Sequence, residues 1–290
     1  MVRPLRLEVA GATYLVTAQA ARGEVLFGSD AESARFLELL ARTARRYGWT
    51  CLAWSLGRTR YRLLLRLGPQ TLAQGMRFLN SSYSQTGREP SPFRRQLFDR
   101  RYEATPVDEA RALPEAVLKT MHTPLEEALA EDLDDWPWSS HAALLGDAEA
   151  PDWLAIAPVL DAFGATPRAA LERYRLVLRQ GSAVARCGRR LHDAAFLDAL
   201  RARRYQETSV SSPVGEASTH QALAAYRAAH GSRREAMRAA YATGCFTQRD
   251  IARYFGVHAA TVSRAMGRVA RWREPVVAAI RWPAHGLLLH

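Results

Sequence analysis

The first half of the chain switches between two hydrophobic periods, and each switch marks where an element begins or ends. Short apolar or alternating runs, which are typical of strands, occupy residues 12–17, 49–56, 60–67 and 102–107. Apolar side chains three and four positions apart, the pattern of one helix face, occupy residues 30–47, 72–86 and 108–122. This order predicts a βαββαβ unit and one more helix. Pro106 favours an edge position for the fourth strand, because proline cannot donate a ladder hydrogen bond.

Beyond residue 151 the helical spacing continues, over residues 157–163, 167–180, 192–205, 233–243 and 248–271. Residues 208–219 are small, polar and punctuated by Pro213 and Gly215, which is typical of a flexible linker. We therefore expect an α+β protein of four parts. These are a βαββαβ domain over residues 1–150, a helical connecting region over 151–207, a flexible linker over 208–219 and an all-α domain over 220–290.

Two helices of the last part have the spacing of a helix-turn-helix. Thr247 can cap the first helix, and Gly256 permits the left-handed conformation that the turn requires. Ile251, Val257 and Val262 fall where they would bury the angle between the two helices. The second helix then fits the major groove of duplex DNA, with its N-terminal side chains at the base edges. An ordinary αα-hairpin inside a helical domain is the alternative interpretation.

Charge is divided unequally between the two halves of the chain. Residues 1–150 carry 19 basic and 19 acidic side chains, whereas residues 151–290 carry 21 and 10, the whole of the net charge of +11. Every basic residue except Lys119 is arginine, which suits bidentate contacts with phosphate and guanine. The second half is therefore expected to hold duplex DNA. The residues expected to contact it are Gln248, His258, Ala259, Ala260, Thr261, Ser263, Arg264 and Arg268.

Composition excludes several other classes of protein. No apolar run approaches the length of a membrane span, and the N-terminus has no apolar signal region. Three scattered cysteines indicate neither a disulfide framework nor a zinc site. No phosphate-binding glycine loop, dinucleotide fingerprint or His-Glu-x-x-His motif occurs, so we expect no cofactor. The expected location is the bacterial cytoplasm, in association with the nucleoid.

Several segments of the first half, in their order and spacing, resemble the single-strand tyrosine transposases of the HUH superfamily, most closely the REP-associated type. They are residues 3–7, 11–17, 49–56, 60–67, 75–85, 97–103, 107–108 and 135–140. The resemblance implies a ferredoxin-like fold for the βαββαβ unit. Longer members of the family carry a replication-initiator-like helical domain after it, which agrees with a DNA-binding second half.

The chain departs from this family at the catalytic positions. Arg60 and Arg62 stand where the family has the two histidines that hold a divalent metal, and a guanidinium offers a metal no lone pair. Aligned on Pro124, Lys119 takes the place of the nucleophilic tyrosine, and lysine cannot form a phosphotyrosine link. No histidine precedes His122. The sequence therefore predicts neither a metal site nor catalytic residues.

Arg58, Arg60 and Arg62 alternate with other residues, so they are expected on one face of a strand. One interpretation is a surface that grips the phosphates of hairpin or single-stranded DNA, and the other is a solvated face. Tyr83 and Tyr102 are weak candidates for a displaced nucleophile, and packing is the favoured role for both.

Two further candidates are disfavoured as catalytic groups. His122 is interpreted as a surface or capping residue. Ser139, Ser140 and His141 are sequence neighbours, which gives no nucleophile–base geometry.

Three functions from different classes remain. The preferred one is a catalytically inactive, transposase-derived, sequence-specific DNA-binding protein that acts as a transcriptional regulator, and as a homodimer. The first alternative is a working REP-associated-type transposase or nuclease that acts on single-stranded hairpin DNA with displaced catalytic residues. The second is a structural or protein-interaction protein. Metal-dependent nicking of hairpin DNA, and duplex affinity that falls steeply with salt, would separate the three.

Overall fold

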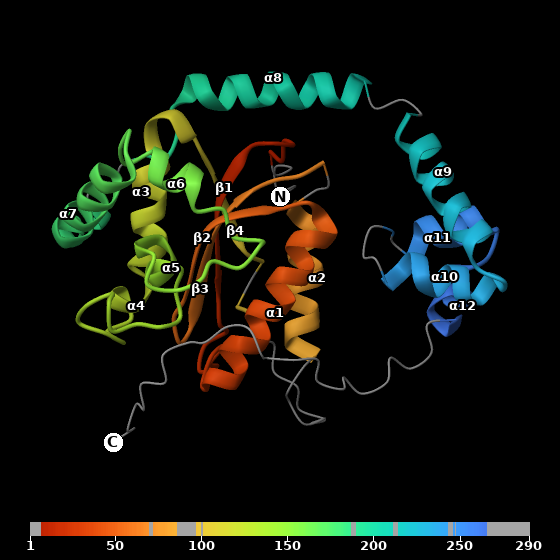
Figure 1. The fold of residues 1–290 in the computed structure, drawn as a ribbon, viewed down its shortest axis with the longest axis horizontal. Coiled ribbons are helices and arrows are strands. Elements are labelled where there is room, and N and C mark those ends of the chain that lie inside the picture. The colour runs from red at the N-terminus through yellow and green to blue at the C-terminus, as the bar shows by residue number, and fades with distance from the viewer. Residues whose placement is uncertain are drawn as a thin grey trace. The chain divides into compact units, whose positions relative to one another are not determined.

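The computed structural model describes residues 7–69, 72–85, 97–99, 101–186, 190–210, 214–242, 246 and 248–265. These residues combine a four-stranded sheet with many helices, which confirms the expected α+β class (Figure 1). None of the described helices is both long enough and apolar enough to span a membrane.

The sheet is antiparallel and has the strand order β2-β3-β1-β4. Its strands are β1 (Thr13–Gln19), β2 (Thr50–Leu56), β3 (Arg60–Arg66) and β4 (Glu103–Val107). Each strand lies within two residues of the run that the hydrophobic pattern predicts. The edge position expected for β4 from Pro106 is confirmed, since β4 pairs only with β1 among the described strands.

The two faces of the sheet carry different helices (Figure 1). Helices α1 (Asp30–Tyr47) and α2 (Leu72–Gln85) cover one face, where Tyr61, Leu63 and Leu65 of β3 are buried. Helix α3 (Glu109–Met121) covers the other face, where Leu64 is buried. Because strand side chains alternate, Arg60 and Arg62 lie on the α3 face.

The ends of α1 follow the expected capping chemistry. The side chain of Ser29 accepts a hydrogen bond from the backbone of Glu32, and Gly48 ends the helix with φ of 65°. Asp108 is the N-cap residue of α3, but its side chain makes no capping hydrogen bond. Its backbone N–H donates to Leu191 instead, at 2.8 Å.

Residues after α3 also pack on this side of the sheet. They include α4 (Thr123–Glu126), α5 (His141–Leu145), α6 (Ala157–Asp161) and α7 (Pro167–Arg186). Val159, Phe163 and Tyr174 belong to the same buried cluster as α3. The region expected to connect two domains is therefore in large part core of the first unit.

The outer edge of β2 is covered by two later segments. The backbone of Ser140 donates to Trp54 at 2.9 Å, and that of Leu56 donates to Trp138 at 2.8 Å. Further along, Cys51 donates to Trp153 at 3.2 Å and accepts from Ala155 at 2.8 Å. This edge is thereby paired, as an edge strand must be to avoid pairing with another chain.

The described residues form two compact units, and the chain passes from the first to the second between Arg201 and Ala202. This boundary lies inside α8 (Ala194–Val210), and α9 (Val214–Ala229) follows. The expected flexible linker over residues 208–219 is therefore wrong for 208–210 and 214–219, which are helical. Packing of Leu223 into the core of the second unit stabilises α9, and such tertiary contacts override local composition.

The second unit continues with α10 (Arg233–Ala242), α11 (Gln248–Phe255) and α12 (Ala259–Ala265). Its small core contains Leu223, Met237, Ile251, Phe255 and Val262.

Candidate functional site

Helices α11 and α12 are two short helices joined by a tight turn at Gly256. Gly256 adopts φ of 59°, the left-handed conformation expected for the turn. The backbone of Val257 donates to Ala252 at 2.9 Å, which closes the end of α11. His258 then begins α12: its carbonyl accepts from Thr261 at 2.8 Å, and its Nδ1 accepts from the backbone of Ala260 at 3.2 Å.

The angle between α11 and α12 is filled by small and β-branched side chains. Ile251 and Val262 are fully buried, and Ala252 and Ala265 are buried beside them. Val257, also expected in this core, is only partly buried.

The side chains expected to meet DNA differ in their exposure. His258, Ala260, Ser263 and Arg264 are exposed, whereas Gln248, Ala259 and Thr261 are half-buried. The Arg264 guanidinium lies along its own helix, with Nε 3.3 Å from the carbonyl of Ala260 and Nη2 3.4 Å from Oγ1 of Thr261. Bonds of this length are weak, so the group is available to an external partner. Thr247 and Arg268 lie outside the described residues.

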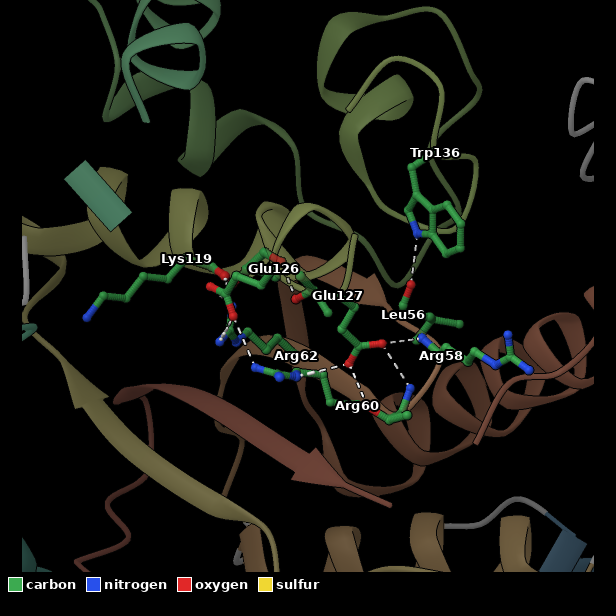
Figure 2. Close-up of polar contacts among 11 residues, drawn as sticks. Leu56, Arg58, Arg60, Arg62, Lys119, Glu126, Glu127 and Trp136 are labelled. Atoms are coloured by element: carbon green, nitrogen blue, oxygen red, sulfur yellow. Dashed lines mark hydrogen bonds and ion pairs between the residues drawn. The ribbon is translucent and has the colours of Figure 1, made fainter. Parts of the chain in front are cut away.

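A second cluster of predicted residues lies on the α3 face of the sheet, where two arginines meet two glutamates (Figure 2). Arg60 donates from Nη1 to Glu126 at 3.0 Å and from Nε to Glu127 at 3.0 Å. Arg62 donates to both carboxylate oxygens of Glu126, at 2.8 and 2.7 Å. Two positive and two negative charges face one another, so the cluster is neutral.

Glu127 is held by four donors from a single turn. Its carboxylate accepts from the backbone of Arg58 at 2.6 Å, from the backbone of Thr59 at 3.0 Å, from the Thr59 hydroxyl at 2.9 Å and from Arg60. Only 8% of the Glu127 side chain is exposed. A Cβ atom at Gly57 would lie 2.7 Å from this carboxylate, so any other residue there would displace the Glu127 side chain from its present position.

Arg60, Arg62 and Lys119 are neighbours in space. Arg62 donates from Nη1 to the backbone carbonyl of Lys119 at 2.7 Å, close to the end of α3. The Lys119 ammonium and the Arg58 guanidinium both point away from the two glutamates (Figure 2). Arg58 is exposed, and its guanidinium makes no hydrogen bond or ion pair with any described residue.

These contacts change the expected picture of an open, phosphate-gripping arginine face. Arg58 is accessible, but Arg60 and Arg62 are engaged by carboxylates of their own chain. Glu126 and Glu127 come directly after Pro124 and Leu125, close in sequence to Lys119 of α3. This closeness to a candidate position is the only feature of the sequence that could have pointed to the two glutamates. The local hydrophobic pattern does not show that they turn back toward β3.

The other catalytic candidates are placed away from this cluster. Tyr83 and Tyr102 are buried in the core on the opposite, α1 and α2 face of the sheet. The Tyr83 hydroxyl donates to the carbonyl of Leu26 at 2.5 Å. Their expected roles in packing agree with this location.

His122 was expected at the surface or at a helix cap. It is buried, but it does lie at a cap position, after the end of α3 and before α4. Its Nε2 has no hydrogen-bond partner among the described residues. Burial lowers the pKa of its imidazole. The charge of Glu126 raises this pKa in part, and that of Arg62 lowers it further.

His141 has partners that its sequence neighbours do not suggest. Its Nδ1 lies 2.8 Å from the Tyr174 hydroxyl, and its Nε2 lies 2.8 Å from Asp134. Ser140 instead bonds the backbone of Trp54, so no serine faces this imidazole. The arrangement links α7 to the segment before α5 and presents no accessible nucleophile, because Tyr174 is fully buried.

Within the part of the chain that the structure describes, no group of three or more His, Cys, Asp or Glu side chains is placed to hold a metal ion.

Comparison with known proteins gives one structural likeness. No protein-family model and no curated protein matches the chain. A solved structure of a REP-associated tyrosine transposase bound to a REP hairpin is 13% identical, with a TM-score of 0.44. The matched region covers 50% of this chain and 86% of the transposase chain.

Proposed function

We propose that this protein is a sequence-specific binder of duplex DNA, derived from a transposase and without catalytic activity, that acts as a transcriptional regulator. The observation that carries the proposal is the α11–α12 segment. It combines a left-handed glycine turn and a buried interhelical angle with exposed polar side chains, His258 just before α12 and Ser263 and Arg264 within it. Exposed polar side chains at this place are what a recognition helix needs.

The charge distribution supports the same assignment. The whole net charge of +11 belongs to residues 151–290. A protein that neutralises several phosphates binds DNA with an affinity that falls steeply as salt rises. We propose Gln248, His258, Ala259, Ala260, Thr261, Ser263, Arg264 and Arg268 as the duplex contacts. In this proposal Arg58, Arg60 and Arg62 contribute only non-specific or hairpin binding.

Arg264→Ala tests the recognition helix. If Arg264 reads a guanine, the variant should lose about 1–3 kcal/mol of discrimination between cognate and scrambled duplexes. Ser263→Ala should lose less, because a neutral hydroxyl contact is weaker than a charged one. The measurement is affinity by fluorescence anisotropy, at several salt concentrations, on a site recovered by genome-wide occupancy mapping.

Arg58→Ala is the matched control, since it removes one exposed arginine from the other unit. It should leave the ratio of cognate to scrambled affinity unchanged. The proposal is wrong if Arg58→Ala changes that ratio and Arg264→Ala does not.

The first unit, in this proposal, is a ferredoxin-like domain that has lost its chemistry. Its strand order and antiparallel pairing are those of a βαββαβ arrangement. Arg60 and Arg62 offer no lone pair to a metal, and Lys119 cannot form a phosphotyrosine. Incubation with hairpin DNA and magnesium or manganese should therefore give no cleavage. A covalent protein–DNA adduct would contradict inactivity and favour a working transposase.

We also propose that the protein binds DNA as a homodimer. A helix-turn-helix protein gains specificity by reading two half-sites about one helical turn apart. Light scattering at micromolar concentration should give twice the mass of the 32.3 kDa chain. A monomer, both free and on a two-half-site duplex, would contradict this.

A further inference from the structure

The turn between β2 and β3 has donors of the kind that bind phosphate. We define the anion cup as the backbone N–H groups of Arg58 and Thr59, the Thr59 hydroxyl and the guanidiniums of Arg60 and Arg62. Consecutive backbone N–H groups form concave anion sites, and guanidinium is the side chain best suited to phosphate. In the structure, every one of these donors is directed at a carboxylate of Glu126 or Glu127 (Figure 2).

The segment that supplies the two glutamates is short and locally strained. Helix α4 has four residues, and Ala128, directly after Glu127, adopts φ of 53°. A residue with a Cβ atom rarely adopts this left-handed conformation, because the Cβ crowds the neighbouring backbone. The contacts in the anion cup, together with the backbone hydrogen bonds from Ala128 to Leu125 and from Leu129 to Pro124, hold the turn in this conformation.

The two glutamates differ in burial, which suggests that Glu126 leaves the anion cup before Glu127. The Glu126 side chain is 35% exposed, against 8% for Glu127. An external anion can therefore approach Glu126 first, together with Arg60, whose side chain is 27% exposed against 14% for Arg62. Arg58 is exposed on the same turn and adds a positive charge near the cup, although its guanidinium points away from the two glutamates (Figure 2).

We propose that Glu126 and Glu127 stand in for phosphate groups, so that the anion cup is a phosphodiester site for single-stranded DNA that the chain itself keeps closed. Displacement of the two carboxylates by two phosphates replaces one set of charge-assisted hydrogen bonds with another of the same kind. The inference rests on the proposed function only in taking DNA as the source of phosphate. Free inorganic phosphate shares the chemistry and is an arm of the test.

The test uses the full chain with Glu126→Gln and Glu127→Gln together, and a thymidine oligonucleotide of about ten nucleotides as the probe. Affinity measured by anisotropy should rise about tenfold or more over the unchanged protein, because both guanidiniums are freed for phosphate. Adding Arg60→Gln and Arg62→Gln should abolish the gain. Glu126→Gln alone, at the more exposed position, should give a smaller gain and is the variant to use if the double change impairs folding.

Glu131→Gln with Glu149→Gln is the matched control. Both glutamates are exposed and hydrogen-bond no described residue, so the pair makes the same change in net charge away from the cup. An equal gain in affinity from this control pair would overturn the proposal, because net charge alone would then explain the effect.

Hydrogen exchange at the amides of Arg58 and Thr59 locates the binding. Both amides should exchange about tenfold faster in the Glu126→Gln, Glu127→Gln protein, and the oligonucleotide should restore protection. Inorganic phosphate should protect them only at much higher concentration, as a single anion does not span the cup. Unchanged exchange on adding the oligonucleotide would show that the glutamates form a structural ion-pair network only. None of these outcomes depends on Arg264, so they are separable from failure of the duplex-binding proposal.

Discussion

Single residues show how tertiary contacts decide chemistry that composition leaves open. The alternation of β3 predicted that Arg60 and Arg62 share a face, and they do. Their partners Glu126 and Glu127 lie more than sixty positions later in the chain. The helical and strand periods relate only residues a few positions apart, so they could not reveal these ion pairs. The sequence therefore predicted an open arginine face where the structure has a neutral cluster.

His122 gives a prediction at this scale. Burial lowers the pKa of its imidazole, so the folded protein keeps it neutral while the unfolded chain takes up a proton near its ordinary pKa of about 6.5. The unfolded state then binds more protons, and the free energy of unfolding should fall as pH drops below about 6.5. His122→Gln should remove up to about 1.4 kcal/mol per pH unit from this slope.

Urea unfolding between pH 7 and 5 measures this slope. Carboxylates such as Glu109 change the free energy of unfolding at a lower pH than His122 does. Burial raises the Glu109 pKa, but hydrogen bonds from Arg66 and Thr13 outweigh this and hold it below its usual value. The stability that Glu109 contributes is therefore lost only in more acidic solution. Parallel pH profiles for His122→Gln and the unchanged protein would refute the role given to His122.

At the scale of elements, the hydrophobic periods predicted the limits of helices and strands better than local composition did. The strands and the helices α1, α2 and α3 begin and end within about two residues of their predicted limits, because each buries one face against the sheet. The stretch around Pro213 and Gly215 was predicted as linker from composition. Helix α9 nevertheless begins at Val214, since its later residues pack into the second unit.

The start of α12 gives a prediction at this scale. The His258 imidazole accepts a hydrogen bond from the backbone of Ala260, in the manner of a helix N-cap. His258→Ala should cost about 0.5–2 kcal/mol of stability in the second unit, and His258→Asn should restore most of it. Thermal unfolding of the three proteins is the measurement. Equal losses in the alanine and asparagine variants would show that the cap contributes nothing.

At the scale of the whole molecule, two compact units each have a buried core of their own. The four-part division expected from sequence placed boundaries at residues 150, 207 and 219. The structure divides the described residues between Arg201 and Ala202. Phe163 and Tyr174 pack with α3, a contact between segments about fifty residues apart that local spacing does not encode, so residues after 150 contribute to the core of the first unit.

Separate cores predict unfolding in two steps. Ile251→Ala should lower the midpoint of one calorimetric transition, and Leu40→Ala that of the other, because each side chain is fully buried in one core only. Each change should cost about 2–5 kcal/mol in its own unit. A single transition shifted by both variants would contradict independent cores.

The covered edge of β2 has a consequence for biosynthesis. The ribosome makes residues 50–56 long before residues 138–140 and 153–155, whose backbones pair with them in the finished protein. Until those segments emerge, the strand presents free N–H and C=O groups on its outer side, a template for adhesion between nascent chains. A polypeptide that stops before residue 138 keeps this template permanently. Forms of the first unit that stop before residue 138 should therefore precipitate, whereas those that extend to Arg201, and so keep both the pairing segments and the core residues of α6 and α7, stay dispersed.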